Sequence, residues 1–161
     1  MQNNQLKQLI DTSSRIILKV GSSLLINENN NDINYHWLNN FSKEIQSLTD
    51  KKKQIMIVSS GSVALGRNQL NLVKNLSLDE KQAAAAVGQI HLSHAWKEVL
   101  KLFNLESAQI LLAPDDTETR RKHLNARATL LKLLQLNVIP VINENDTVST
   151  CLLYTSPSPR D

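Results

Sequence analysis

The sequence predicts an α/β fold, a three-layer α/β/α sandwich with a largely parallel central sheet. Four short apolar runs have the length and composition of buried strands, and segments with helical periodicity lie between them. Because strands and helices alternate along the chain, right-handed crossovers and helices on both faces of the sheet are expected. With 161 residues, the chain is long enough for one ordinary domain that buries about two thirds of its unfolded surface.

The predicted strands are each rich in Ile, Val or Leu and are bounded by turn-forming residues. They are expected over Arg15 to Val20, Gln54 to Ser59, Ala108 to Ala113 and Val138 to Ile142. We expect the last of these strands to end the sheet with an unpaired edge.

Three helices are predicted between the strands. Asn34 is placed to cap the first, whose apolar face is formed by Tyr35, Leu38, Phe41, Ile45 and Leu48. Ser77 followed by Glu80 is a capping-box signature, which opens a long helix to about Phe103. The third helix starts near Thr117, and its apolar positions are Leu124, Ala128, Leu131 and Leu134.

Composition excludes several classes of protein. The longest unbroken apolar run, Ala83 to Val87, is far shorter than the roughly 18 residues of a membrane span. The N-terminal segment has no apolar stretch of the kind found in secretory signals, and Cys151 has no second cysteine to pair with, so a cytoplasmic protein is expected. The net charge of +3 is dispersed and aromatic residues are few, which argues against a nucleic-acid partner for this segment.

Polar or turn-forming residues follow each predicted strand, where ligands bind in open parallel sheets. Any strand must end in turn residues, so each segment alone fits a plain turn. Their convergence on one edge of the sheet favours a ligand site. The segments are Gly21-Ser22-Ser23, Ser60-Gly61-Ser62, Pro114-Asp115-Asp116-Thr117 and Asn143-Glu144-Asn145-Asp146.

Lys19 stands near the end of an otherwise apolar strand, directly before the turn at Gly21. A lysine is seldom buried without an anion beside it. If the glycine lets the backbone approach a ligand, Lys19 offers a positive charge to a phosphate. The alternative is a strand-end lysine whose ammonium group reaches solvent, and the local pattern leaves both interpretations open.

The segment Ser60-Gly61-Ser62 is expected to begin a helix, and free amides at a helix start favour an anion. The glycines of this helix have the spacing of a P-loop, but Arg67 and Asn68 stand where Lys and Ser or Thr are required, which disfavours that motif. His91 and His94 are spaced to share a metal, yet no third ligand is indicated, so two ordinary histidines are favoured.

The segment from Asn143 to Asp146 combines two carboxylates with two amides. Carboxylates suit an ammonium group, and amides suit a carboxylate or carbonyl of a substrate. A plain turn remains the alternative for Glu144 and Asn145 individually.

Five segments carry a resemblance to a known family: ILKVGSSLL (17–25), IMIVSSGSVALGR (55–67), KQAAAAVGQ (81–89), LNARATL (124–130) and VIPVINENDTVST (138–150). In this order they resemble the glutamate 5-kinases of the amino acid kinase superfamily, and AAVGQ with VINEND separates these from acetylglutamate kinases, aspartokinases and uridylate kinases. The resemblance implies an amino acid kinase-like fold and ATP-dependent phosphorylation of the L-glutamate γ-carboxylate, the first step of proline biosynthesis. It further implies Mg²⁺, proline as a feedback inhibitor and a homo-oligomer when intact.

On the nucleotide side, the resemblance assigns Lys19 as the catalytic lysine at the ATP phosphates, with Gly21 and Ser22 as the first phosphate-loop positions. Glutamate has an unperturbed side-chain pKa of ~4.3, so its carboxylate is already ionised at neutral pH and no general base is required. In-line positioning and neutralisation of charge are the tasks left to the protein.

On the substrate side, the resemblance assigns glutamate binding to five residues. Ser60 matches a glutamate-binding serine with Gly61 beside it, and Asp146 matches the carboxylate that holds the substrate, supported by Asn143 and Asn145. No residue is assigned as a metal ligand.

The resemblance ends near Thr150, where a GDND-like segment is expected and is absent from the sequence. We therefore predict an incomplete kinase domain over residues 1–150, its N-terminal, glutamate-binding part, and a foreign or artefactual tail over 151–161. The alternatives are a non-catalytic half-domain and another carboxylate or carbamate kinase of the superfamily.

Overall fold

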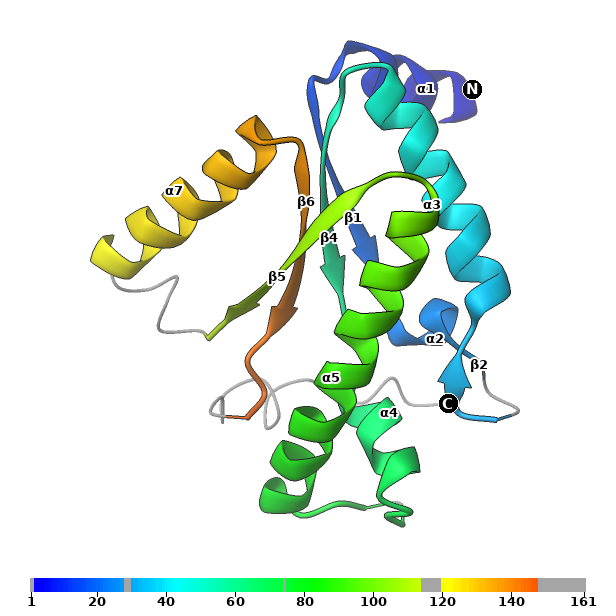
Figure 1. Ribbon diagram of the computed structural model, residues 1–161, viewed down its shortest axis with the longest axis vertical. Coiled ribbons are helices and arrows are strands. Elements are labelled where there is room, and N and C mark those ends of the chain that lie inside the picture. Colours follow the sequence, from blue (N-terminus) through cyan, green and yellow to red (C-terminus); the bar gives the residue numbers. More distant parts are fainter. Residues whose placement is uncertain (1, 28–29, 74, 114–119, 148–161) are drawn as a thin grey trace.

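The computed structural model describes residues 2–27, 30–73, 75–113 and 120–147, and it has the predicted α/β architecture (Figure 1). Its main sheet has four strands in the order β1-β4-β6-β5, and all of its pairings are parallel. The strands are β1 (Arg15–Val20), β4 (Gln54–Ser59), β5 (Glu106–Leu112) and β6 (Val138–Glu144). The predicted bounds of β1 and β4 are confirmed, and the other two strands are each displaced or extended by one or two residues.

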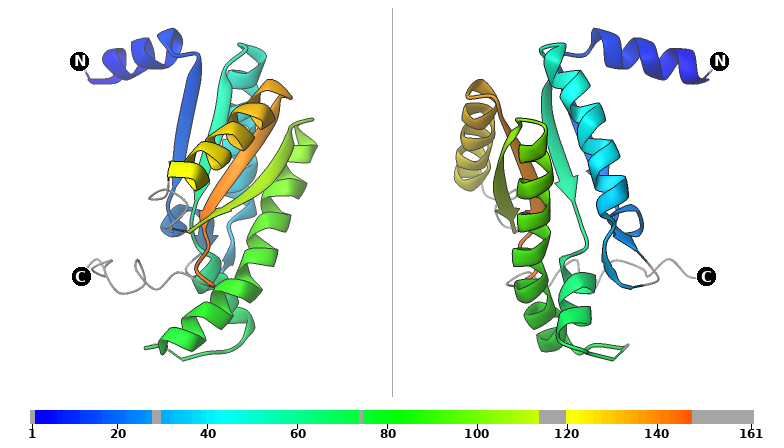
Figure 2. Two further views of the ribbon diagram at one scale, coloured as in Figure 1. Left: turned by 90° about the vertical axis from the view of Figure 1, so that its left-hand side faces the viewer. Right: turned by 45° about the vertical axis from the view of Figure 1, so that its right-hand side comes forward.

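Helices cover both faces of this sheet. Helices α3 (Tyr35–Asp50) and α5 (Leu78–Leu102) lie on one face, and α7 (Arg120–Gln135) lies on the other (Figures 1 and 2). The three-layer arrangement is thereby confirmed. None of the described helices is both long enough and apolar enough to cross a membrane.

The predicted helix starts are confirmed where the structure describes them. The Asn34 side chain accepts a hydrogen bond from the Trp37 backbone N–H at 3.1 Å. Ser77 and Glu80 form the complete capping box of α5. The predicted start of the third helix near Thr117 lies outside the described residues.

Several short elements escaped prediction. Helix α1 (Gln2–Thr12) leaves its apolar residues Leu6 and Leu9 more than half exposed, so it has no buried face to reveal it in the pattern. Helix α2 (Ser22–Leu25) and the antiparallel pair β2 (Ile26–Asn27) and β3 (Asp32–Ile33) are too short to show a period. Helix α4 (Ser62–Gln69) begins where the Ser60-Gly61-Ser62 segment predicts.

The position of β6 corrects one expectation. The strand lies between β4 and β5, so it is an interior strand and not the unpaired end of the sheet. Because β5 is placed on the outside and the chain returns through α7 to the gap beside β4, order in the sequence differs from order in the sheet. The two outermost strands of the described sheet are β1 and β5.

The apolar core lies between the sheet and helices α3 and α5. Trp96 of α5 is buried in it, and its indole N–H donates a hydrogen bond of 3.0 Å to the Ser59 hydroxyl at the end of β4. This bond satisfies both buried polar groups and fixes α5 against the carboxyl end of the sheet.

Helices α4 and α5 touch through their backbones. A Cβ atom on Gly88 would lie 1.8 Å from the carbonyl oxygen of Ser62, and one on Gly66 would lie 1.8 Å from that of Ala84. Only glycine permits an approach this close. The contact brings the start of α4 and the middle of α5 to the same end of the sheet.

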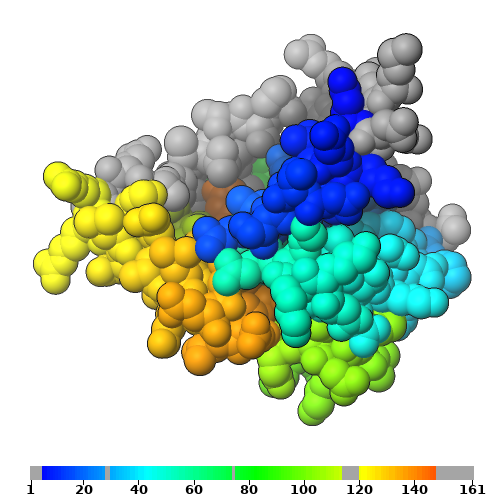
Figure 3. Space-filling view, turned by 90° about the horizontal axis from the view of Figure 1, so that it is seen from above, coloured from blue at the N-terminus to red at the C-terminus, as the bar shows by residue number. Residues whose placement is uncertain are grey.

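The opposite end of the molecule carries the amino ends of the strands, seen from above in Figure 3. There α1 is anchored by Lys53, whose ammonium group donates to the carbonyl oxygens of Asp11 and Ser13, both at 2.7 Å. The lysines at 51 and 52 are exposed, in line with the solvated turn that three consecutive lysines suggest.

Candidate active site

Polar residues gather at the carboxyl ends of the parallel strands, at the lower end of the sheet in Figure 1. The loop after β6 is tied to β5 because the Asn145 backbone N–H donates to the Leu112 carbonyl at 2.9 Å. The loop after β4 is tied to β1 because the Ser60 hydroxyl donates to the Val20 carbonyl at 3.3 Å. The predicted segments after β1, β4 and β6 thus meet at one edge, and the Pro114–Thr117 segment lies outside the described residues.

Asp146 is the half-buried carboxylate of this edge. Its Oδ2 accepts a hydrogen bond from the Ser62 hydroxyl at 3.1 Å. Burial raises the pKa of Asp146 above its usual value of 3.8, and the Ser62 hydrogen bond acts in the opposite direction. Within the described part of the chain, the carboxylate is therefore held by the Ser62 hydroxyl, in surroundings that partly exclude water.

Asn143 is buried and belongs to the same cluster. Its Nδ2 donates to the Gln89 Oε1 at 2.6 Å, and the Ser62 Oγ lies 3.5 Å from the same nitrogen. The four side chains of Gln89, Asn143, Ser62 and Asp146 form one continuous chain, which we call the acceptor cluster. It joins α5, β6, α4 and the loop after β6.

The start of α4 presents backbone amides to the same edge. Gly61 is the N-cap residue, with φ of 117°, and no side chain caps the helix. A side chain at this position is strained by the left-handed φ and would press on the Ile26 Cδ1, 3.1 Å from the added Cβ. The glycine therefore sets the direction in which α4 leaves β4.

Lys19, Gly21 and Ser22 form the second part of this end of the sheet, and we call them the phosphate loop after the role that the sequence predicts. Alternation along β1 directs Lys19 to the sheet face opposite the buried Val20, and its side chain is exposed. A Cβ on Gly21 would meet only the Ser23 hydroxyl, at 3.9 Å, so the loop has open space before it. The alternative in which the ammonium group reaches solvent describes Lys19 in this structure.

The structure separates the predicted site residues into two groups. Asn143 and Asp146 share Ser62 as a hydrogen-bond partner. Lys19 is in register with Val58 and Ile142, so it lies on the face of the sheet opposite Asn143. The side chain of Asn145 accepts from the Thr147 hydroxyl at 2.5 Å, a local contact that fits the turn alternative.

The side chains of two members of the acceptor cluster, Gln89 and Ser62, were given no role from the sequence. Gln89 lies within AAVGQ and Ser62 is the last residue of the predicted anion segment Ser60-Gly61-Ser62, so both stand in segments that carry the family resemblance. Periodicity gave no signal for either, because each acts through a partner distant in the sequence.

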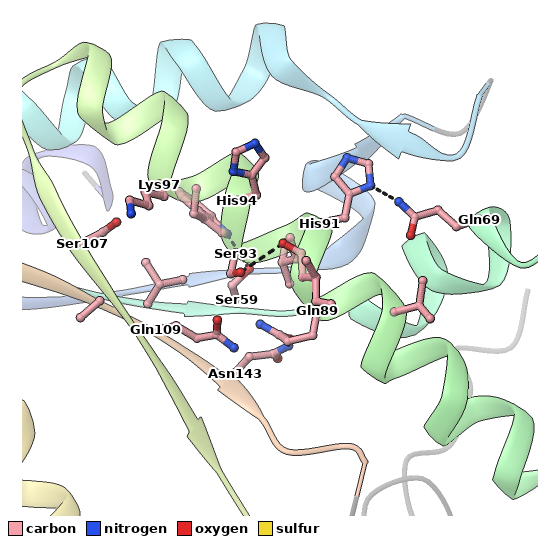
Figure 4. Close-up of a pocket in the computed structure, with 16 residues that line it drawn as sticks. Ser59, Gln69, Gln89, His91, Ser93, His94, Lys97, Ser107, Gln109 and Asn143 are labelled. Carbon is pink, nitrogen blue, oxygen red and sulfur yellow. Dashed lines mark hydrogen bonds between the residues drawn. The ribbon is translucent and has the colours of Figure 1, made fainter.

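A groove of about 880 Å³ lies beside the acceptor cluster, between α5 and strands β5 and β6 (Figure 4). Asn143 and Gln89 approach each other in the lower middle of the view, Lys97 and Ser107 lie at one end, and Gln69 lies at the other. The two histidines of α5 contact different partners: His91 lies 3.4 Å from Asp32, and His94 lies 3.3 Å from Glu98.

The chain resembles proteins of known class. The model of the amino acid kinase family matches residues 14–154. The glutamate 5-kinase of Paramagnetospirillum magneticum is 46% identical over 148 residues, 92% of this chain and 40% of that protein. That of Rhodopseudomonas palustris is 51% identical over 137 residues, 84% of this chain and 36% of that protein.

The fold also has a solved counterpart. The structure of UMP kinase from Bacillus anthracis matches with a TM-score of 0.55 and 20% sequence identity, and covers 80% of this chain and 52% of that one. This likeness supports the fold, and the curated relatives support the closer sequence relationship. The chain spans 36–40% of the length of the two glutamate 5-kinases. On the family match over residues 14–154, the chain belongs to the amino acid kinase family.

Proposed function

We propose that this chain forms the glutamate-binding side of an enzyme that transfers the γ-phosphoryl group of ATP to the γ-carboxylate of L-glutamate. The observation that carries the proposal is the acceptor cluster at the carboxyl edge of the sheet. It is built from the VINEND and AAVGQ segments together with Ser62 of IMIVSSGSVALGR, in a chain 46–51% identical to two glutamate 5-kinases.

The proposed binding mode follows from charge. Asp146 meets the α-ammonium group of glutamate, because an ionised carboxylate in partly dry surroundings is a strong acceptor for a cation. Ser60 and the amides after Gly61 meet a carboxylate of the substrate, with Asn143 and Asn145 in support. The γ-carboxylate is already ionised, so the protein needs no base to activate it.

The phosphate loop faces the other reactant. Exposed Lys19 and the open space at Gly21 fit the phosphates of ATP, with Ser22 at the start of α2 beside them. When bound with the nucleotide, Mg²⁺ would supply positive charge to the phosphates, and Lys19 stabilises the charge that develops on the transferred group. Lys19 is therefore the proposed catalytic residue.

A cytoplasmic location is also proposed, on the composition of the chain. Feedback inhibition by proline and assembly into a homo-oligomer are proposed on the family resemblance. We also propose that the kinase part of the chain ends at residue 150 and that 151–161 form a foreign tail. Residues 148–161 lie outside the described part of the chain.

The second candidate is a glutamate-binding half-domain without catalysis, favoured by the 36–40% coverage of the relatives. The test is glutamate-dependent ADP release, measured for the 161-residue chain and for a protein extended to the relatives' length. We expect turnover only in the extended protein, because holding both reactants in line contributes up to roughly 7–11 kcal/mol. Equal turnover in both would contradict the expectation that catalysis requires the extended protein.

The same assay tests which substrate accepts the phosphoryl group. N-acetyl-L-glutamate keeps both carboxylates but has no ammonium group for Asp146 to bind. We expect the extended protein to use L-glutamate and to reject the acetylated form. Preference for the acetylated form would instead favour another carboxylate kinase of the family.

A further inference from the structure

We propose that Ser62 is a positioning residue, whose hydroxyl holds the Asp146 carboxylate in its substrate-binding orientation and is itself oriented by Asn143 and Gln89. The proposal rests on the proposed function, since it assigns Asp146 to the glutamate ammonium group. It adds two side chains, those of Ser62 and Gln89, that do not themselves meet the substrate.

The backbone of Ser62 has little freedom. It follows Gly61 in its left-handed conformation, and its carbonyl oxygen lies against Gly88 so closely that a Cβ there would be 1.8 Å away. Its side chain is buried, with 2% of the residue exposed. The hydroxyl therefore starts from a fixed point, as precise positioning of another group requires.

The hydrogen bonds of the cluster have a defined direction. An ionised carboxylate only accepts, so the Ser62 hydroxyl must donate to Asp146. The oxygen of Ser62 is then left to accept from the Asn143 amide at 3.5 Å, and the same Nδ2 donates to Gln89 at 2.6 Å. Gln89 thus fixes the amide of Asn143, which faces the oxygen of Ser62.

The electrostatic role of Ser62 follows from the two influences on Asp146. Burial disfavours the ionised form, and the Ser62 hydrogen bond favours it. Among the described residues, Glu144 is the other ionisable residue lining the small cavity at Asp146, and a second carboxyl group does not stabilise an ionised carboxylate. Among the described lining residues, the Ser62 hydroxyl is the group that favours the form able to bind an ammonium.

The first test is the pKa of Asp146, followed by carboxyl ¹³C NMR in the 161-residue chain. We expect Ser62→Ala to raise this pKa further, because the stabilising donor is removed and burial remains. The matched control is Ser47→Ala, an exposed serine of α3, which should leave the titration of Asp146 unchanged. An Asp146 titration that is identical in wild type and Ser62→Ala overturns the proposal.

The second test is the affinity for L-glutamate across pH, in the protein extended to the relatives' length. We expect Ser62→Ala to weaken binding about tenfold and to shift the acidic limb of the binding profile to higher pH. A merely structural role would weaken binding equally at every pH, and that outcome overturns the proposal. Gln89→Ala, which leaves the start of α4 intact, should weaken glutamate binding by a smaller factor.

The two proposals can fail separately. If Ser62→Ala raises the pKa of Asp146 but wild type binds no glutamate, the positioning contact stands and the proposed substrate is wrong. If glutamate binds and neither the titration nor the pH profile responds to Ser62→Ala, the proposed function stands and the role of Ser62 is wrong.

Discussion

The acceptor cluster and the phosphate loop both lie at the carboxyl ends of the parallel strands, but they differ in the burial and the partners of their side chains. In the cluster, each polar side chain meets another, and Ser62 and Asn143 are buried. In the loop, Lys19 is exposed and Gly21 faces open space. A site for a small, fixed substrate gains from preorganisation, whereas a group that meets a transferred phosphoryl must remain accessible. Substitutions in the two regions should therefore separate substrate binding from turnover.

The largest effect is expected for Lys19→Ala in the protein extended to the relatives' length. Turnover should fall by a factor on the order of 10² to 10³, as when one donor to a developing negative charge is removed. Glutamate affinity and thermal stability should hardly change, because the side chain is exposed. Steady-state kinetics would check this, and an increased ATP requirement with unchanged kcat would show that Lys19 serves only ground-state binding.

Two glycines offer a matched pair for stability. Gly88→Ala should destabilise the fold by roughly 1–3 kcal/mol or more, since a Cβ 1.8 Å from the Ser62 carbonyl oxygen forces α4 and α5 apart. Gly21→Ala should change the free energy of unfolding little, because its φ of −76° suits any residue and the space is open. Denaturant unfolding of both variants measures the difference, and equal losses would contradict the backbone contact.

Asp146→Asn should reduce glutamate affinity at least tenfold, about 1.4 kcal/mol, because the charge that meets the ammonium is lost.

The same substitution should not lower the free energy of unfolding at neutral pH. The folded pKa of Asp146 is raised, so its favourable contribution is present below its unfolded pKa and is lost as pH rises through the folded one. At pH 7 the variant should thus be at least as stable as wild type.

Thermal unfolding of wild type and Asp146→Asn from pH 3 to 7 measures this difference. The advantage of the variant should grow as pH rises through the acidic range. A variant that becomes relatively less stable as pH rises would show that the ionised carboxylate stabilises the fold.

Ser60→Ala should have the smallest effect. Its hydroxyl is exposed and donates to the Val20 carbonyl over 3.3 Å, so a neutral hydrogen bond worth about 0.5–1.5 kcal/mol is at stake. We expect a severalfold rise in the KM for glutamate with little change in kcat. An effect as large as that of Lys19→Ala would place Ser60 among the reacting groups.

Features that depend on local sequence could be predicted, and features that depend on distant partners could not. The strands, the capped helices and the polar strand ends follow from local chemistry, such as the Ser77–Glu80 box and the apolar β4. The position of β6 inside the sheet depends on which strands pair, which no local pattern records. The partnership of Gln89 with Asn143, 54 residues apart, was hidden for the same reason.

Glutamate binding at this end of the sheet is tested by titrating L-glutamate into the isotope-labelled 161-residue chain and following its amide and side-chain NMR signals. We expect saturable shifts centred on Ser60, Asn143 and Asp146, absent with N-acetyl-L-glutamate and much weakened in Asp146→Asn. Shifts that centre elsewhere, or that are the same with the acetylated compound, would contradict the assignment of this edge as the glutamate site.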